Sequence, residues 1–271
     1  MLLATFVAST ILGAACSSSG SGDSATASPS PSPSPSPSSS ATATPSATPT
    51  PVGAFSCLGT ALPASASDPI VISGTVTTTD ASGTTPVGSA TVAAFKTGTS
   101  TALVSGVSSV SGAYSLTVPT SGLPVDGYLL STKSGFLDTY VYPSEPASKT
   151  ATVDVSMLTS STFGFLQSFA GVTQNASKGA IIVEVVDCNG SPIAGATITS
   201  SPAGTVRYLS GGIPSSSATA TDVAGVAFIF NVGPGDVSVM STAGGNTLRA
   251  HTVNARAGSA LTTTQIAPGP H

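Results

Sequence analysis

The sequence predicts an all-β protein, with two tandem antiparallel β-sandwich domains placed after a signal peptide and a disordered Ser/Pro-rich tether. Three observations support this prediction. Short segments of alternating apolar and polar residues, separated by Gly, Pro, Ser and Asp, run through most of the chain. The β-branched residues Thr and Val are frequent in these segments and favour strands. One strand–turn–strand pattern occurs twice, at 72–95 and 181–200, which indicates two related modules of about 100 residues each.

Composition excludes one large class of partner. The chain has 271 residues, of which 40% are hydrophobic and only 7% are charged. Lys and Arg total 7 against 11 Asp and Glu, so the formal net charge is −4. No basic stripe is present that could neutralise a row of phosphates, and we therefore expect no nucleic acid partner.

Residues 1–15 have the features of a secretory signal peptide. They are apolar, they end in small residues before Cys16, and they are too few to span a bilayer as a helix. The segment resembles the signal of bacterial lipoproteins, in which the Cys after a small-residue box is lipidated and becomes the mature N-terminus. This resemblance implies a lipid anchor on Cys16 and a place in the bacterial cell envelope, at the outer membrane or the cell surface. The alternative is simple cleavage, which leaves Cys16 as an ordinary thiol.

Residues 16–54 are rich in Ser, Pro and Thr and poor in apolar side chains. Such a segment buries too little surface to offset the entropy lost on ordering, so we expect a disordered tether. Alternating Ser-Pro favours an extended chain of about 3.1 Å per residue, which would hold a domain at most on the order of 100 Å from a membrane.

Residues 55–158 form the first predicted sandwich. Short strands are expected at 69–79, 88–97, 101–110, 112–120, 126–134, 136–143 and 149–157. The pattern resembles the carboxypeptidase regulatory-like, or transthyretin-like, domain. The residues that carry this resemblance are Gly74-Thr75-Val76, Pro86-Val87, Ala90, Val92 and Ser111-Gly112-Ala113-Tyr114-Ser115-Leu116. It implies a module of the kind that accompanies enzymes or receptors and does not itself catalyse a reaction.

Residues 159–178 are predicted to form a helical linker. Phe163, Leu166, Phe169 and Ala170 fall at helical spacing, and Gly171 can end the helix. We expect this apolar face to pack on one or both sandwiches; the alternative is an exposed apolar surface for a partner. The second predicted sandwich, a regulatory-like or Ig-like module, occupies 179–268, and its alignment with the first places an insertion within 201–221.

Three cysteines are present, at positions 16, 57 and 188. If Cys16 carries lipid, Cys57 and Cys188 remain as an even pair in an oxidising compartment, where a disulfide is expected. Their Cα atoms should then lie about 4.4–6.8 Å apart. The alternative is two buried free thiols.

The residues required for common catalytic chemistry are sparse. His251 and His271 are the only histidines, and no Gly-x-Ser-x-Gly motif occurs, so a hydrolytic triad has almost no base to use. No His or Cys cluster has zinc-ligand spacing. Asp187 and Asp222 are expected to serve ordinary turn chemistry, with calcium binding as the alternative. We therefore predict no enzyme activity, no metal and no cofactor.

Three classes of function remain. The first is a non-catalytic, membrane-anchored lipoprotein whose β-sandwich modules bind or adhere. The second is a carbohydrate-binding module, because the regulatory-like fold is similar to starch-binding sandwiches and Tyr128, Phe136, Tyr140 and Tyr142 could offer stacking rings. Trp is absent and aromatics total 5%, which disfavours a sugar platform. The third is a structural accessory subunit of a cell-envelope complex. The expected partners are thus the membrane and a glycan or an envelope protein.

Overall fold

The computed structural model describes residues 53–80 and 82–269. The predicted signal peptide, Cys16 and nearly all of the predicted tether lie outside the described residues. The predicted all-β fold class is confirmed. The elements that belong to the first module are β1 (Ile70–Asp80), β2 (Gly83–Pro86), β3 (Thr91–Lys96), β4 (Ala102–Val107), β5 (Ala113–Val118), β6 (Gly127–Thr132), β7 (Asp138–Tyr142), β8 (Ala151–Thr152) and β9 (Val155–Ser156), preceded by the 3-10 turn η1 (Gly53–Phe55).

The second module begins with the one α-helix of the described residues and continues with strands. Its elements are α1 (Ser160–Ala170), β10 (Gly179–Val185), β11 (Thr197–Ser201), β12 (Thr205–Ser210), β13 (Ile213–Ser215), β14 (Val226–Val232), β15 (Gly235–Ala243), β16 (Asn246–Thr247), β17 (His251–Ala255) and β18 (Ala260–Ile266). The segment 201–221, within which the insertion was predicted, contains the antiparallel pair β12 and β13.

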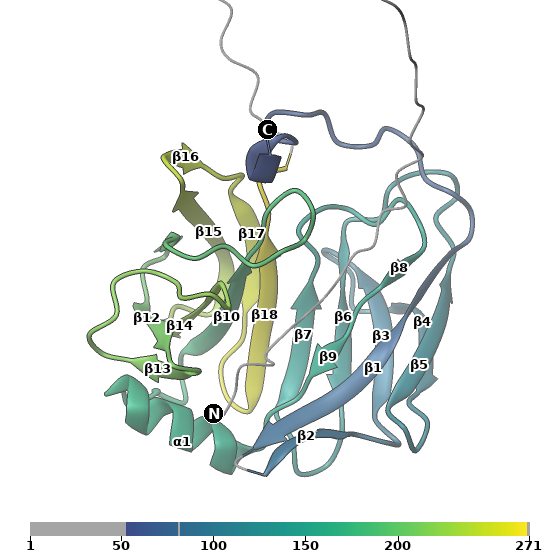
Figure 1. The fold of residues 1–271 in the computed structure, drawn as a ribbon. Helices are drawn as coiled ribbons and strands as arrows, with labels where there is room; N and C mark the ends of the chain where they lie inside the picture. The colour runs from purple at the N-terminus through teal and green to yellow at the C-terminus, as the bar shows by residue number, and fades with distance from the viewer. Residues whose placement is uncertain (1–52, 81, 270–271) are drawn as a thin grey trace, which may run out of the picture. The chain divides into compact units, whose positions relative to one another are not determined.

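One long sheet runs through both modules (Figure 1). Its nine strands have the order β13-β12-β14-β10-β18-β7-β6-β3-β4. The modules meet where β18 pairs with β7 in a parallel ladder that aligns Ala260 with Asp138 and Thr264 with Tyr142. Strand β10 is also parallel to β18, so the pairing is not antiparallel throughout as the sequence predicted. The predicted boundaries at 158 and 179 remain a prediction, because the shared sheet joins the two modules.

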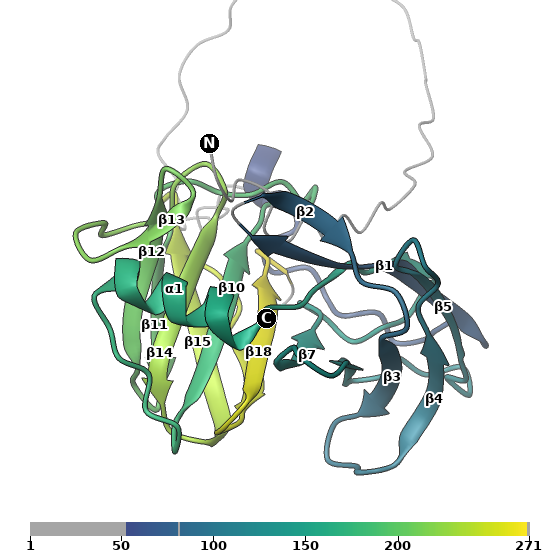
Figure 2. The same cartoon turned by 90° about the horizontal axis from the view of Figure 1, so that it is seen from below.

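Two smaller sheets and the helix cover this long sheet. The sheet β2-β1-β5, with β8 and β9 parallel to β1, packs on the β3, β6 and β7 part. Helix α1 covers the same face over the second module, where Figure 2 shows it lying across β14 and β10. The sheet formed by β11, β15, β16 and β17 covers the opposite face over the second module, and its core reaches Tyr142 on β7. That opposite face of β3, β6 and β7 carries the tyrosines of the sequence prediction.

The predicted internal repeat is confirmed by matching hydrogen bonds in the two modules. The Val76 amide donates to the Gly112 carbonyl over 2.8 Å, and the Val185 amide donates to the Gly225 carbonyl over the same distance. Both glycines have positive φ, 78° and 68°, and a Cβ on either would lie 2.4 or 2.6 Å from the carbonyl oxygen of the first strand. Only glycine fits such a turn, which explains why it recurs in both copies.

A second pair of matching contacts uses a buried hydroxyl. Ser108 Oγ accepts from the Ala90 amide and donates to the Val87 carbonyl. Thr221 Oγ1 accepts from the Ala196 amide and donates to the Ile193 carbonyl. These hydroxyls satisfy backbone groups at the Pro-containing turns, and they hold each turn against the start of its second strand.

Helix α1 ends at the predicted glycine, but its buried face is narrower than predicted. Thr159 is the N-cap, since its hydroxyl accepts from the Thr162 amide, and Gly171 ends the helix in the left-handed conformation. Phe163, Leu166 and Ala170 are buried between the helix and the long sheet. The prediction that Phe169 joins them is wrong, because at six residues from Phe163 it lies off the buried stripe. Phe169 is 43% exposed.

The predicted disulfide between Cys57 and Cys188 is present. The two Cα atoms are 5.6 Å apart, within the predicted range. Beside the bond, the Cys188 amide donates to the Ala54 carbonyl over 2.9 Å. The Phe55 ring packs on the core of the second module and lies against Gly244. The end of the predicted tether is thus fastened to the second module, although the chain then continues into the first.

Candidate binding site

Three of the four predicted ring residues form one cluster on the face of the long sheet that also carries the β11, β15, β16 and β17 sheet. Tyr142 is buried against that sheet, and its ring centroid lies 6.4 Å from that of His251 on β17. The ring centroid of Tyr128 on β6 lies 5.1 Å from that of Tyr142 and 5.9 Å from that of Tyr140, and both of these tyrosines are on β7. Phe95 on β3, which the sequence analysis did not single out, stacks on Tyr128 at 5.3 Å with an interplanar angle of 9°. The cluster forms because these residues are cross-strand neighbours on one face of three adjacent strands.

Close backbone packing makes the Phe95–Tyr128 stack feasible. Gly127 precedes Tyr128, and a Cβ at that position would lie 2.1 Å from the Phe95 carbonyl oxygen. The β3–β4 ladder also shifts register between Ala94 and Phe95. Such a bulge bends a strand locally and redirects its side chains.

Arg256, after β17, joins the tyrosine cluster to the second module. Its guanidinium carbon lies 3.7 Å from the Tyr140 ring centroid and 5.1 Å from that of Tyr128. Its Nη1 donates to the Tyr142 hydroxyl over 3.2 Å and to the Asn254 carbonyl over 2.9 Å. Burial raises the pKa of Tyr140 and Tyr142, although the guanidinium opposes this effect. The cluster therefore stabilises the contact between the modules.

The ring faces are largely occupied within the protein. Phe95, Tyr128 and Tyr142 stack on one another, and Arg256 covers a face of Tyr140. Stacking on a sugar requires an open ring face. A role for Tyr128, Tyr140 and Tyr142 in ligand contact stays a prediction, and this arrangement gives it little support.

Phe136, the fourth predicted ring, lies away from the cluster. It is half-buried in the turn before β7, and the Lys133 ammonium lies 5.8 Å from its centroid. The same ammonium donates to the Gly88 carbonyl over 2.7 Å. Phe136 and Lys133 border a shallow polar depression with Ser89, Thr91 and Asp138. The structure does not bring Phe136 together with the three tyrosines.

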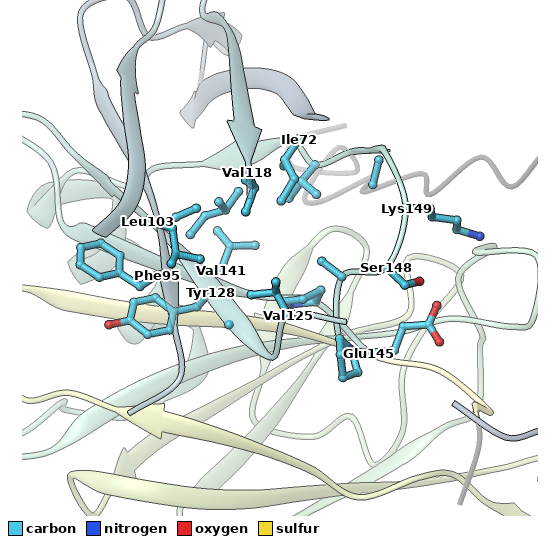
Figure 3. Close-up of a pocket in the computed structure, with 18 residues that line it drawn as sticks. Ile72, Phe95, Leu103, Val118, Val125, Tyr128, Val141, Glu145, Ser148 and Lys149 are labelled. Carbon is cyan, nitrogen blue, oxygen red and sulfur yellow. The ribbon is translucent and has the colours of Figure 1, made fainter. Parts of the chain in front are cut away.

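An apolar cavity of about 70 Å³ opens next to the Phe95–Tyr128 stack. Ile72 and Val118 line it from the β1–β5 sheet, and Ala94, Leu129 and Val141 line it from the long sheet. Figure 3 shows Ile72, Val118 and Val141 close together, with Leu103 of β4 beside Phe95. The cavity therefore lies where the two sheets of the first module separate at one end.

The loop after β7 closes one side of this cavity. Val125 and Ala147 form an antiparallel bridge in which each amide donates to the other carbonyl over 2.9 Å. Glu145, Ser148 and Lys149 belong to the same loop, and Figure 3 shows the polar ends of their side chains pointing away from the cavity. The interior is thus apolar, and charge is present only at the outer edge.

The groups capable of acid–base chemistry do not meet in this cavity. His251 on β17 is half-buried, its Nδ1 lies 2.8 Å from Thr264 Oγ1, and burial lowers its pKa to about 4. Glu184 on β10 is 3% exposed, burial raises its pKa to about 8, and it accepts a hydrogen bond from Gln265 Nε2 over 3.1 Å. The sequence analysis missed Glu184, although a single Glu within an apolar strand is a recognisable signal.

The two aspartates considered for calcium make turn hydrogen bonds. Asp187 Oδ1 accepts from the Asn189 and Ser191 amides, each over 2.8 Å. Asp222 Oδ1 accepts from the Ala224 amide over 3.0 Å. Across residues 53–80 and 82–269, no three His, Cys, Asp or Glu side chains come close enough to hold a metal ion. In the same residues, no helix is long and apolar enough to span a membrane.

Comparisons with known proteins give only distant similarities. No family model and no curated protein matches the chain. Among solved structures it is similar to the Bacillus anthracis TIE protein, with 14% identity and a TM-score of 0.25 over 72% of this chain and 33% of that one. The chain thus spans about a third of the length of that protein.

Two pilins are also similar to this chain. The shaft pilin spaA from Lactobacillus rhamnosus GG has 10% identity and a TM-score of 0.23, over 75% of this chain and 98% of that one. The minor pilin GBS52 from Streptococcus agalactiae has 14% identity and a TM-score of 0.23, over 74% and 97%. These TM-scores assign this chain to no family.

Proposed function

We propose that this protein is a non-catalytic lipoprotein of the bacterial cell envelope, anchored through Cys16, which presents its β-sandwich modules at the end of a tether for binding or adhesion. The disulfide between Cys57 and Cys188 carries the proposal, because structural disulfides persist in oxidising compartments outside the cytosol. With both of these cysteines bonded, Cys16 is the one cysteine left for lipidation.

Labelling with radioactive fatty acid tests the anchor. Wild-type protein expressed in a bacterium that processes lipoproteins should incorporate label and partition into the membrane fraction, because acyl chains contribute about 0.8 kcal/mol per buried CH₂. The Cys16→Ser variant should incorporate none and appear in the soluble fraction. The matched control is the double variant Cys57→Ser/Cys188→Ser, which should carry as much label per protein molecule as wild type, even if its lower stability reduces the amount of protein. Equal labelling of wild type and Cys16→Ser would contradict the anchor.

Two other functions would lead to different results. A carbohydrate-binding module would bind specific glycans on an array, and that binding would weaken in Phe136→Ala, the predicted ring whose face is not stacked on another predicted ring. An accessory subunit of an envelope complex would co-purify from membranes with defined proteins. The proposed lipoprotein function requires neither glycan binding through Phe136 nor co-purification with defined envelope proteins.

A further inference from the structure

Strand β4 forms one end of the nine-stranded sheet and has a free edge. It pairs with β3 on one side, and within the described residues no strand hydrogen-bonds to its other side. A free edge presents unpaired N–H and C=O groups to which another strand can add. Natural edges are usually protected by charged residues or proline, but the β4 sequence ALVSGV contains neither. Leu103 and Val107 are 36% and 64% exposed.

The apolar cavity lies beside this edge. Leu103 of β4 and Phe95 of β3 both line it, so a chain that extended the sheet next to β4 would pass its rim. One water-sized group needs about 10–15 Å³ of cavity volume. The cavity of about 70 Å³ therefore accommodates about five to seven such groups. That is the size of one branched aliphatic or phenyl side chain.

We propose that the β4 edge and the adjacent cavity together bind an extended peptide segment of a partner protein, which adds a strand to the sheet and inserts one large apolar side chain into the cavity. Main-chain hydrogen bonds would supply much of the affinity, and the cavity would supply the selectivity for Leu, Ile or Phe. This inference does not depend on lipidation of Cys16.

A second copy of this chain fits the site less well. If the β4 strands of two copies paired edge to edge, the side chains of one copy that faced the cavity of the other would be every second residue of β4. One set, Ala102, Val104 and Gly106, has no side chain as large as leucine. In the other set, Leu103 already lines the cavity of its own molecule, and Val107 is exposed on the surface. Self-pairing would therefore leave the cavity poorly filled, whereas a foreign strand with a larger residue would fill it.

Titration of the oxidised full-length chain with short peptides tests the proposal. The probe is the acetylated, amidated peptide Lys-Thr-Leu-Thr-Leu-Thr-Lys, followed by ¹H–¹⁵N shifts of β4 and methyl shifts of Ile72, Val118 and Leu129. We expect saturable shifts at both places. Replacing the two leucines by alanine should weaken binding at least tenfold. N-methylating the alternate peptide amides that face β4 should do the same, whereas N-methylating the other alternate set, which faces away from β4, should have little effect.

Protein variants separate the edge from the cavity. Ser105→Lys places a charge on the exposed side of β4 and should weaken binding of the leucine peptide at least tenfold. The matched control Thr199→Lys makes a similar change on β11, an exposed edge strand of the second module, and should have no effect. Ala147→Leu, in the loop that lines the cavity, should weaken the leucine peptide more than the alanine peptide.

Three results would overturn the proposal. The first is the absence of peptide-dependent shifts in β4. The second is binding that is insensitive to N-methylation, which would indicate a small-molecule cavity without strand addition. The third is that the protein binds no peptide but forms a concentration-dependent dimer, which Ser105→Lys abolishes. That result would make this edge an interface between copies of the chain.

Discussion

At the residue scale, two buried titratable side chains give opposite pH dependences of stability. Burial raises the pKa of Glu184 to about 8, so between about pH 4.5 and 8 the folded state retains a proton that the unfolded state releases, and stability falls as pH rises. Burial lowers the pKa of His251 to about 4, so between about pH 4 and 6.5 the unfolded state holds the additional proton, and stability rises with pH.

The two effects nearly cancel between pH 4.5 and 6.5, and only the Glu184 effect remains above pH 6.5. We predict that the free energy of unfolding falls by about 1.4 kcal/mol per pH unit between pH 6.5 and 8. Urea denaturation at a series of pH values measures this slope. Glu184→Gln should remove the decline, and His251→Gln should extend it down to about pH 4.5. Persistence of the decline above pH 6.5 in Glu184→Gln would contradict the assignment.

At the scale of single elements, α1 contains closely spaced phenylalanines with different roles. Phe163 is 8% exposed and packs against Phe230 with ring centroids 6.1 Å apart, whereas Phe165 is 48% exposed. Phe163→Ala should lower the free energy of unfolding by about 3–5 kcal/mol, because it removes a buried ring and leaves a cavity.

The control for this prediction is Phe165→Ala in the same helix. Phe165 contacts Phe169 in an edge-on arrangement with centroids 4.6 Å apart, and an aromatic pair of this kind contributes about 0.5–1.5 kcal/mol. Chemical denaturation of both variants should therefore show at least a twofold difference in the loss of stability. If Phe165→Ala and Phe163→Ala lost similar free energies of unfolding, the Phe165–Phe169 pair would have to be buried in solution, contrary to its exposure in the structure.

Strand positions could largely be predicted from sequence, because period-2 alternation and turn residues are local signals. Strand β5 (Ala113–Val118), with every second residue buried, lies within the predicted strand 112–120, and it follows Gly112, one of the residues quoted from the sequence. The shared sheet could not be predicted, since the β7–β18 pairing joins residues more than 100 positions apart and leaves no local pattern. The cavity was missed for the same reason, because its lining comes from several separate strands.

Side-chain roles were harder to predict than strand positions. The four predicted rings included Phe136, which lies apart from the three tyrosines, and the partner of those tyrosines, Arg256, is 114 residues from Tyr142. Sequence alone gives no indication that a cation would cover those rings. The disulfide was the exception, since counting cysteines leaves few pairings to consider.

At the scale of the whole molecule, the shared sheet predicts a single cooperative unfolding transition. The β7–β18 ladder and the Arg256 cluster connect the modules, and the disulfide closes a sequence separation of 131 residues. Differential scanning calorimetry should give equal calorimetric and van't Hoff enthalpies. The Cys57→Ser/Cys188→Ser variant should lose up to about 4–5 kcal/mol from the greater entropy of its unfolded state. Two separated transitions in the oxidised protein would contradict a single unit.

The position of the disulfide also determines how the molecule would respond to mechanical tension. Force applied between residues preceding Cys57 and the end of the second module passes through the covalent bond directly into the start of that module. Residues 58–187 lie inside the closed loop and are outside this load path. The first module would therefore add no length to the pulled chain, even if the loss of the β7–β18 ladder unfolded it. In an optical trap, the oxidised protein should extend only by the length of the segments outside the loop.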